Sequence, residues 1–169
     1  KDYKSGSLSD KSQYRYSETY FREKNYTVAI EEFQELIKSF PGSLLCDDAQ
    51  YYIAESYLDS NNPDEALKAY QAVLSNYKDS KYISLARYSS GLAFFKQRKF
   101  QNAILIFEEL VTFFKNNFSQ QDNRLYSESM FYIAESYYYN NRYDEAIEKY
   151  INYLVVFKDN GQYSIESYF

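Results

Sequence analysis

The stretch Tyr52-Ile53-Ala54-Glu55-Ser56-Tyr57 occurs twice in this chain, and its second copy runs from Tyr132 to Tyr137. Asp-Glu-Ala follows each copy, at residues 64–66 and 144–146. Outward from these stretches, four copies of one looser pattern appear. Each has a small residue, an aromatic three residues later, an aromatic or proline, an Ala twelve residues after the small one, and a further aromatic. The copies are Ser17, Tyr20, Tyr26, Ala29 and Phe33; Ala54, Tyr57, Pro63, Ala66 and Tyr70; Gly91, Phe94, Phe100, Ala103 and Phe107; and Ala134, Tyr137, Tyr143, Ala146 and Tyr150.

The spacing of the four alanines indicates a solenoid. They lie 37, 37 and 43 residues apart. A supersecondary unit repeated at such a period cannot bury its apolar face alone, so neighbouring units stack. Composition favours helices: 45% of the 169 residues are hydrophobic, whereas only four Gly and two Pro are present, too few for the many tight turns of an all-β fold.

Charge and cysteine content exclude several classes. The net charge of −5 disfavours duplex DNA or RNA as a partner, because such binding needs a basic face. The short basic cluster Lys96, Arg98 and Lys99 is interpreted as a solvated helix end. Cys46 is the one cysteine, so no intrachain disulfide forms. No apolar run approaches the roughly 18–20 residues of a membrane span.

Hydrophobic periodicity predicts two amphipathic helices in each repeat. Ala29, Ile30, Phe33, Leu36 and Ile37 follow the spacing of one helical stripe. We expect helices at 11–24, 27–39, 45–60, 63–77, 81–97, 100–114, 122–140 and 143–157.

Asn62 is predicted as the N-cap of the helix that opens at Pro63, a residue type favoured in a first helical turn.

The predicted organisation is a polar leader at 1–9 and four repeats at 10–46, 47–83, 84–120 and 127–158. Residues 159–169 are expected to begin a further or capping helix. The additional residues before the fourth repeat fall around Phe118–Asn123, as a polar loop or a helix extension.

The signature residues are interpreted as structural. The small residues and the alanines allow two helices of one hairpin to approach closely, and the aromatics fill the space beside each contact. A larger side chain at one of these alanines would overpack the hairpin at a cost of about 1–3 kcal/mol.

With its small residue, aromatic, alanine and second aromatic, the pattern over residues 10–158 resembles the tetratricopeptide repeat. That resemblance implies an all-α, right-handed α-solenoid of about four helix hairpins plus a partial C-terminal helix. The 37-residue period, with the exit phrase Phe40-Pro41-Gly42-Ser43, is similar to bacterial envelope members of the family. Those members are the lipoprotein of outer-membrane β-barrel assembly and the periplasmic Tol–Pal-associated coordinator. Cys46 lies inside the repeats and is not a convincing lipidation site.

In this architecture the first helix of each hairpin lines a concave groove. The inward stripe of residues is predicted to bind a helix or an extended segment of a protein partner with apolar anchors and some Lys or Arg. The stripe comprises Tyr14, Glu18, Phe21, Tyr51, Glu55, Leu58, Tyr88, Leu92, Phe95, Phe131, Glu135 and Tyr138. The alternative is that half of these rings pack on neighbouring helices.

Two kinds of function are disfavoured. The family's clamp for a terminal carboxylate uses Lys and Asn at positions that here hold Tyr14, Glu18, Tyr51 and Glu55, so an acidic C-terminal tail is expected to be a poor ligand. The chain has no His, the commonest general base and metal ligand, and no glycine-rich phosphate loop. We expect no catalytic residue, no cofactor and no metal.

Three hypotheses follow. The first is a scaffold in a bacterial envelope, periplasmic or membrane-associated through a region outside this chain. The second is a cytoplasmic adaptor or regulator. The third is an accessory domain of a larger protein. The chain begins Lys1-Asp2-Tyr3 without an initiator Met, so it is expected to be a processed or trimmed piece of a longer protein.

Overall fold

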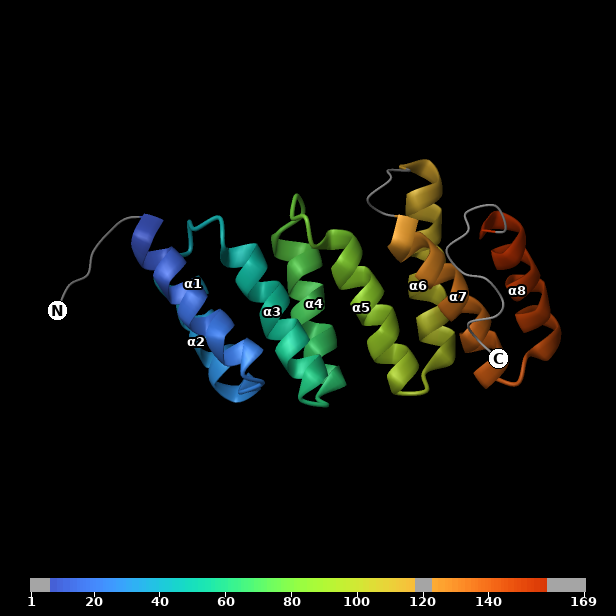
Figure 1. Cartoon of the computed structure of the whole chain (residues 1–169), viewed down its shortest axis with the longest axis horizontal. Coiled ribbons are helices and arrows are strands. Elements are labelled where there is room, and N and C mark those ends of the chain that lie inside the picture. Colours follow the sequence, from blue (N-terminus) through green and yellow to red (C-terminus); the bar gives the residue numbers. More distant parts are fainter. Residues whose placement is uncertain (1–6, 118–122, 158–169) are drawn as a thin grey trace. The chain divides into compact units, whose positions relative to one another are not determined.

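The computed structural model describes residues 7–117 and 123–157, and these form eight helices in four consecutive hairpins (Figure 1). The predicted all-α class and the hairpin count are confirmed, and the predicted helix ends lie within four residues of those observed. The helices are α1 (Ser7–Arg22), α2 (Tyr26–Ser39), α3 (Cys46–Asp59), α4 (Pro63–Asn76), α5 (Ile83–Lys96), α6 (Phe100–Asn116), α7 (Asn123–Tyr139) and α8 (Tyr143–Phe157).

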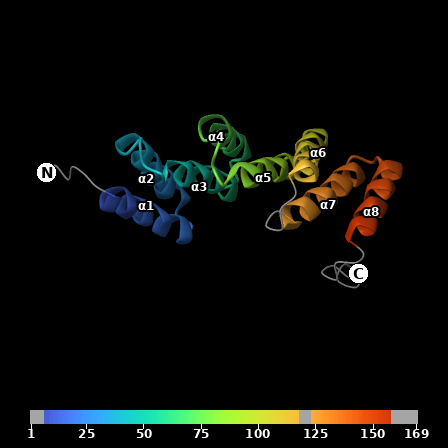
Figure 2. The ribbon, with the colours of Figure 1, turned by 90° about the horizontal axis from the view of Figure 1, so that it is seen from above.

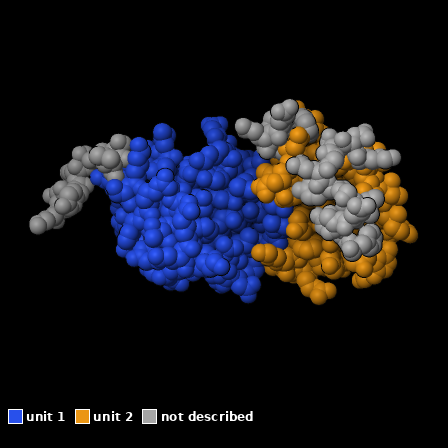
Figure 3. Space-filling model, in the orientation of Figure 1, with its two compact units in different colours: residues 1–93 blue, residues 94–169 orange. Residues whose placement is uncertain are grey.

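The chain divides into two compact units, residues 1–93 (unit 1) and residues 94–169 (unit 2), coloured separately in Figure 3. The division falls inside α5, so unit 1 holds the hairpins α1/α2 and α3/α4 with most of α5. Unit 2 holds α6 and the hairpin α7/α8. Each unit is described by itself.

Small residues allow the close packing of each hairpin in unit 1. Ser17 and Ala29 in the first hairpin, like Ala54 and Ala66 in the second, have no exposed surface. Ser17 keeps its hydroxyl satisfied by donating to the Gln13 carbonyl oxygen at 2.8 Å. Within unit 1, α1 and α3 lie on one side and α2 and α4 on the other (Figure 2). We call the surface formed by α1, α3 and the segment leading into α5 the first-helix face.

The turn inside each hairpin is the same in all four repeats. Its second-to-last residue has a positive φ of about 60°: Lys24, Asn61, Arg98 and Asn141. The next amide then donates to the carbonyl of the signature aromatic, as from Asn25 to Tyr20 at 2.9 Å. This 6→1 bond is the Schellman closure, which satisfies carbonyl groups at the helix end.

In unit 1 one recurring side-chain contact joins the first turn of each first helix to the segment that follows the hairpin. The Ser43 hydroxyl donates to Asp10 at 2.5 Å, and the Ser80 hydroxyl donates to Asp47 at 2.7 Å. Asp10 lies in the first turn of α1, where a carboxylate is favoured by the helix dipole. The polar leader was predicted at 1–9; α1 begins at Ser7, and residues 1–6 lie outside the described residues.

The predicted N-cap Asn62 was confirmed in position only. Asn62 occupies the cap position of α4, but it makes no side-chain cap bond there; its amide donates to the Ser60 carbonyl instead. The polar loop or helix extension was predicted around Phe118–Asn123, of which residues 118–122 lie outside the described residues and Asn123 begins α7. The helix predicted at residues 159–169 also lies outside them. No helix among the described residues is both long and apolar enough to cross a membrane.

The helix α8 carries an apolar outer surface at positions that are polar in α2. Ile151 and Val155 are 57% and 70% exposed on α8. The matching positions of α2 hold Gln34 and Lys38, which are exposed and polar. Ile147, two helical turns before Leu154, is also 57% exposed.

Candidate partner-binding site

The predicted stripe is distributed over both units. Tyr14, Glu18, Phe21, Tyr51, Glu55, Leu58, Tyr88 and Leu92 lie in unit 1, and Phe95, Phe131, Glu135 and Tyr138 lie in unit 2. In unit 1 the three tyrosines are almost completely covered: Tyr14 is 9% exposed, Tyr51 is 6% and Tyr88 is 8%. These rings therefore contribute to the core more than to an accessible groove surface.

Ring contacts explain this burial. The Tyr14 ring lies 5.7 Å from Phe33 of the partner helix α2, measured between centroids. The Tyr51 ring stacks on Tyr82 at 4.4 Å and an interplanar angle of 10°, and it lies 6.1 Å from Tyr70. Burial raises the pKa of Tyr51, because the phenolate loses hydration.

The remaining stripe residues are more accessible. In unit 1, Phe21, Glu55, Leu58 and Leu92 are half-buried. In unit 2, Phe95, Phe131 and Glu135 are half-buried, and Tyr138 is 49% exposed. The Phe131 ring contacts Tyr132 and Tyr150 at centroid distances of 5.7 and 6.3 Å, so it is held between α7 and α8.

Glu18 is buried between two arginines of its own helix. Arg15, three residues before it, donates at 2.5 Å, and Arg22, four residues after it, donates at 2.7 Å. Burial alone would raise the pKa of the Glu18 carboxyl, but the hydrogen bonds and charges of Arg22 and Arg15 outweigh it and lower the pKa. Glu18 is therefore an ionised carboxylate at neutral pH, with both oxygens occupied.

Glu55 stands at the same repeat position but has another donor. It accepts a hydrogen bond from the Tyr70 hydroxyl, fifteen residues later on the second helix of the hairpin. Burial, then the charge and hydrogen bond of Glu55, raise the pKa of Tyr70. The fourth repeat repeats this pair, with the Tyr150 hydroxyl donating to Glu135.

The third repeat lacks both members of this pair, because Leu92 and Phe107 stand at the two positions. The carboxylates of the stripe therefore differ in role: those with a Tyr partner fasten two helices together, and Glu18 instead binds arginines. The spacing of Glu and Tyr by fifteen residues was the sequence signal for this pairing.

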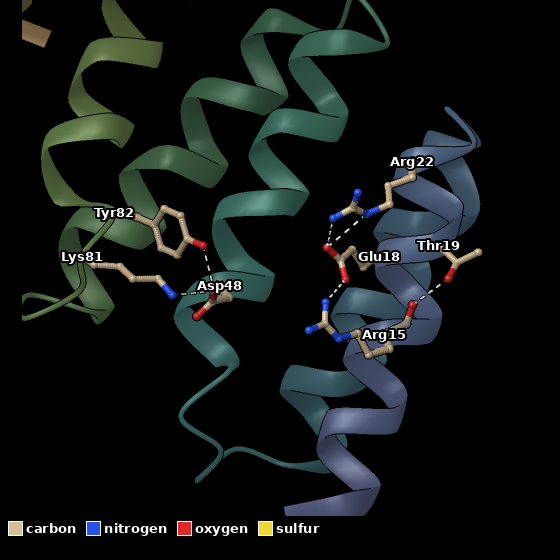
Figure 4. Close-up of polar contacts among 7 residues, drawn as sticks. All are labelled: Arg15, Glu18, Thr19, Arg22, Asp48, Lys81 and Tyr82. Carbon is tan, nitrogen blue, oxygen red and sulfur yellow. Dashed lines mark hydrogen bonds and ion pairs between the residues drawn. The ribbon is translucent and has the colours of Figure 1, made fainter. Parts of the chain in front are cut away.

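A further carboxylate on the first-helix face, Asp48, was not predicted from the sequence. Asp48, near the start of α3, is 8% exposed and accepts from Lys81 Nζ at 2.9 Å and from the Tyr82 hydroxyl at 2.7 Å. These donors belong to the segment that leads into α5, so the contact joins the start of α3 to the segment that follows α4. Figure 4 shows this group beside α3, with Arg15, Glu18 and Arg22 on the neighbouring α1.

Tyr52 was also missed, because it lies one position beyond the predicted stripe. Its half-buried ring contacts Phe21 of α1 at 5.0 Å and Tyr82 at 6.5 Å. It also stacks over Phe33 at 5.7 Å with an interplanar angle of 13°. The recurrence of Tyr52 as Tyr132 in the duplicated stretch could have identified it. In unit 2, Tyr132 stacks on Phe107 in the same way, at 5.5 Å.

Comparison with protein-family models assigns the repeats. Models described as tetratricopeptide repeat match residues 11–43, 51–118 and 128–158, which together make up most of the chain. The chain belongs to the tetratricopeptide-repeat family. Repeats of this family bind peptides and proteins, so the protein is an interaction scaffold. A search of curated protein sequences finds no match.

Several solved structures share the fold. The tetratricopeptide-like repeats of a kinesin light chain from Podosopora anserina align with a TM-score of 0.69 and 15% identity, covering 92% of this chain and 77% of that one. MamA aligns with a TM-score of 0.69 and 17% identity, over 92% of this chain and 77% of its own.

A Rap protein in complex with competence and sporulation factor also aligns, with a TM-score of 0.64 and 17% identity over 90% of this chain. This chain spans 44% of that protein. Identities this low show a shared fold alone.

Proposed function

We propose that this protein is a non-catalytic scaffold that holds a helix or an extended segment of a partner protein against its first-helix face. One observation carries the proposal: in unit 1 this face presents apolar and aromatic side chains that their own helices leave half-exposed. Phe21 of α1, with Tyr52 and Leu58 of α3, supplies the contact area. Aromatic side chains give large contact areas at small entropic cost and are enriched among binding hot spots.

The chemistry of the chain supports the non-catalytic part of the proposal. The sequence contains no His, and its one cysteine, Cys46, is buried and lies in the first turn of α3. Burial raises the pKa of the Cys46 thiol, which disfavours the thiolate needed by a nucleophile.

Site-specific photo-crosslinking tests the binding face. A photoreactive phenylalanine analogue placed at Phe21 or at Leu58 should crosslink a discrete partner in cells that express the chain. The matched control places the analogue at Lys38 or Gln71, which are exposed on the second helices α2 and α4. Crosslinks from the controls without crosslinks from Phe21 or Leu58 would contradict the proposal.

For the compartment, we propose the bacterial envelope. The support is the resemblance of the 37-residue period and of the exit phrase Phe40-Pro41-Gly42-Ser43 to envelope members of the family. Fractionation of the native host with an antibody against this chain tests it: recovery with the periplasmic or membrane fraction supports the proposal. Recovery in the cytosol would favour the alternative of a cytoplasmic adaptor, and a catalytic module in the full-length product would favour an accessory domain.

A further inference from the structure

Two groups of ion pairs on the first-helix face of unit 1 place the carboxylate inside and the cations outside. The Glu18 side chain is 10% exposed, whereas the side chains of Arg15 and Arg22 are 75% and 73% exposed. The carboxylate oxygens are therefore out of reach of a partner. The two guanidinium groups remain accessible and need only part of their donors for Glu18, since each guanidinium carries five N–H groups.

The second ion pair of this face has the same arrangement. The Asp48 side chain is 11% exposed and the Lys81 side chain is 66% exposed. Tyr82 donates a further hydrogen bond to Asp48, so the carboxylate stays satisfied without the lysine. We call the three exposed cations, Arg15, Arg22 and Lys81, the cation rim.

The cation rim flanks the apolar contact area. Figure 4 shows Arg15 and Arg22 extending from α1 toward α3, and Lys81 extending toward Asp48 at the start of α3. The Tyr52 ring of α3 contacts Phe21 on the α1 side and Tyr82 on the other. The three cations are a local feature of this face, because α3 also carries Glu55, which is half-buried, and Asp59, which is exposed.

From this arrangement we propose that the first-helix face of unit 1 recognises a partner segment that carries acidic side chains next to apolar ones. The inference rests on the proposed function and specifies the chemistry of its partner. Partner carboxylates bind Arg22, Arg15 and Lys81, and partner apolar side chains pack on Tyr52 and Phe21. Arginine forks match carboxylates in two-point hydrogen bonds. A partner lysine or arginine would instead approach exposed cations, and like charges brought together disfavour the wrong partner.

This ligand class differs from the ligand of the family's clamp, which is a terminal carboxylate. The clamp positions hold Tyr14, Glu18, Tyr51 and Glu55, whereas the cation rim lies beside that stripe. Recognition is therefore of side-chain carboxylates within a segment, and a free C-terminus adds nothing. The overall negative charge disfavours a nucleic acid as the anionic partner.

Fluorescence anisotropy with labelled synthetic peptides tests the proposal on the full chain. The probe is a twelve-residue peptide of Phe-Glu-Ser repeats, blocked at both ends, and its matched control has Lys in place of every Glu. We expect the Glu peptide to bind at least tenfold more tightly than the Lys peptide, with an affinity that falls between 50 and 200 mM NaCl. Unblocking the C-terminus should change the affinity less than twofold.

The variants are chosen so that both buried carboxylates keep a donor. Arg22→Gln with Lys81→Met leaves Arg15 on Glu18 and Tyr82 on Asp48, and should weaken binding of the Glu peptide at least tenfold. The control combines Lys38→Met on α2 with Lys68→Gln on α4. These two lysines are 81% and 71% exposed, similar to the cation rim, and each is also paired with a glutamate. The control should change the affinity less than twofold.

Three outcomes would overturn the proposal: no binding of the Glu peptide, equal or tighter binding of the Lys peptide, or equal losses in the two double variants. Equal or tighter binding of a labelled twelve-nucleotide poly(dT) would assign the cation rim to nucleic acid instead. None of these results would remove a crosslink from Phe21 or Leu58, so the proposed function and the partner chemistry fail separately.

Discussion

The first two hairpins of unit 1 place a glutamate at the same position and use it in different ways. In α3/α4, Glu55 accepts from Tyr70 and joins the two helices of the hairpin. In α1/α2, Phe33 stands where Tyr70 does, so Glu18 has no hydroxyl across the hairpin and binds Arg15 and Arg22 of its own helix. The presence of one hydroxyl thus decides whether a carboxylate of this repeat serves the core or organises cations on the surface.

The largest effect is expected from breaking the Glu55–Tyr70 pair. Tyr70→Phe should lower the free energy of unfolding by about 1–3 kcal/mol, because it removes a donor from a carboxylate in a largely buried site. Glu55→Leu should also destabilise, because it leaves the buried Tyr70 hydroxyl without its acceptor. The double variant reproduces the Leu92 and Phe107 of the third repeat and should recover part of the loss. Urea denaturation of the four proteins gives the coupling energy; additive losses would contradict the pairing.

A second difference between the two hairpins is expected in how stability depends on alkaline pH. The folded-state pKa of Tyr70 lies above its unfolded value of roughly 10. The stability that the protonated Tyr70 contributes to the folded state is therefore complete below pH 10 and is lost as pH rises further. Above about pH 10.5, one such tyrosine contributes a loss of about 1.4 kcal/mol per pH unit. Tyr70→Phe should reduce the slope of stability against pH by that amount, as followed by circular dichroism. An unchanged slope would show that Tyr70 ionises in the folded protein.

A smaller effect is expected at the turns. Lys24 and Asn61 occupy the same left-handed position, with φ of 60° and 61°. Asn tolerates this conformation better than a long side chain does. Lys24→Asn should therefore stabilise the protein by about 0.5–1 kcal/mol, and Asn61→Lys should destabilise it by a similar amount. Thermal unfolding measures both, and shifts of the same sign in the two variants would refute the explanation.

The regular part of the structure could be predicted from the sequence, because the constraints are local. Ala29 and Ala66 are unexposed, as close helix packing requires, and the helical periodicity gave the hairpins directly. The handedness of the solenoid stays a prediction, since the two units are described separately.

The site was harder to predict, because the position of a side chain on a helix does not determine what covers it. Tyr51 has the spacing of a groove residue, yet Tyr82 from the segment that leads into α5 stacks on its ring. Tyr52, one position later, is less buried and was missed. The pairing of Asp48 with Lys81 spans 33 residues and depends on how the segment after α4 returns to the start of α3, which no local pattern specifies.

The glutamate–tyrosine pair also limits how this chain can be shuffled. Its two members lie on different helices, and the pair occurs in the second and fourth hairpins, while the first and third carry Phe33 and Phe107. A chimaera joined within a hairpin, with its first helix from the second repeat and its second helix from the first, would set Glu55 against Phe33 and remove the Tyr70 donor from the carboxylate. A chimaera joined between hairpins inherits each glutamate–tyrosine pair whole. The hairpin is therefore the smallest exchangeable block for recombination.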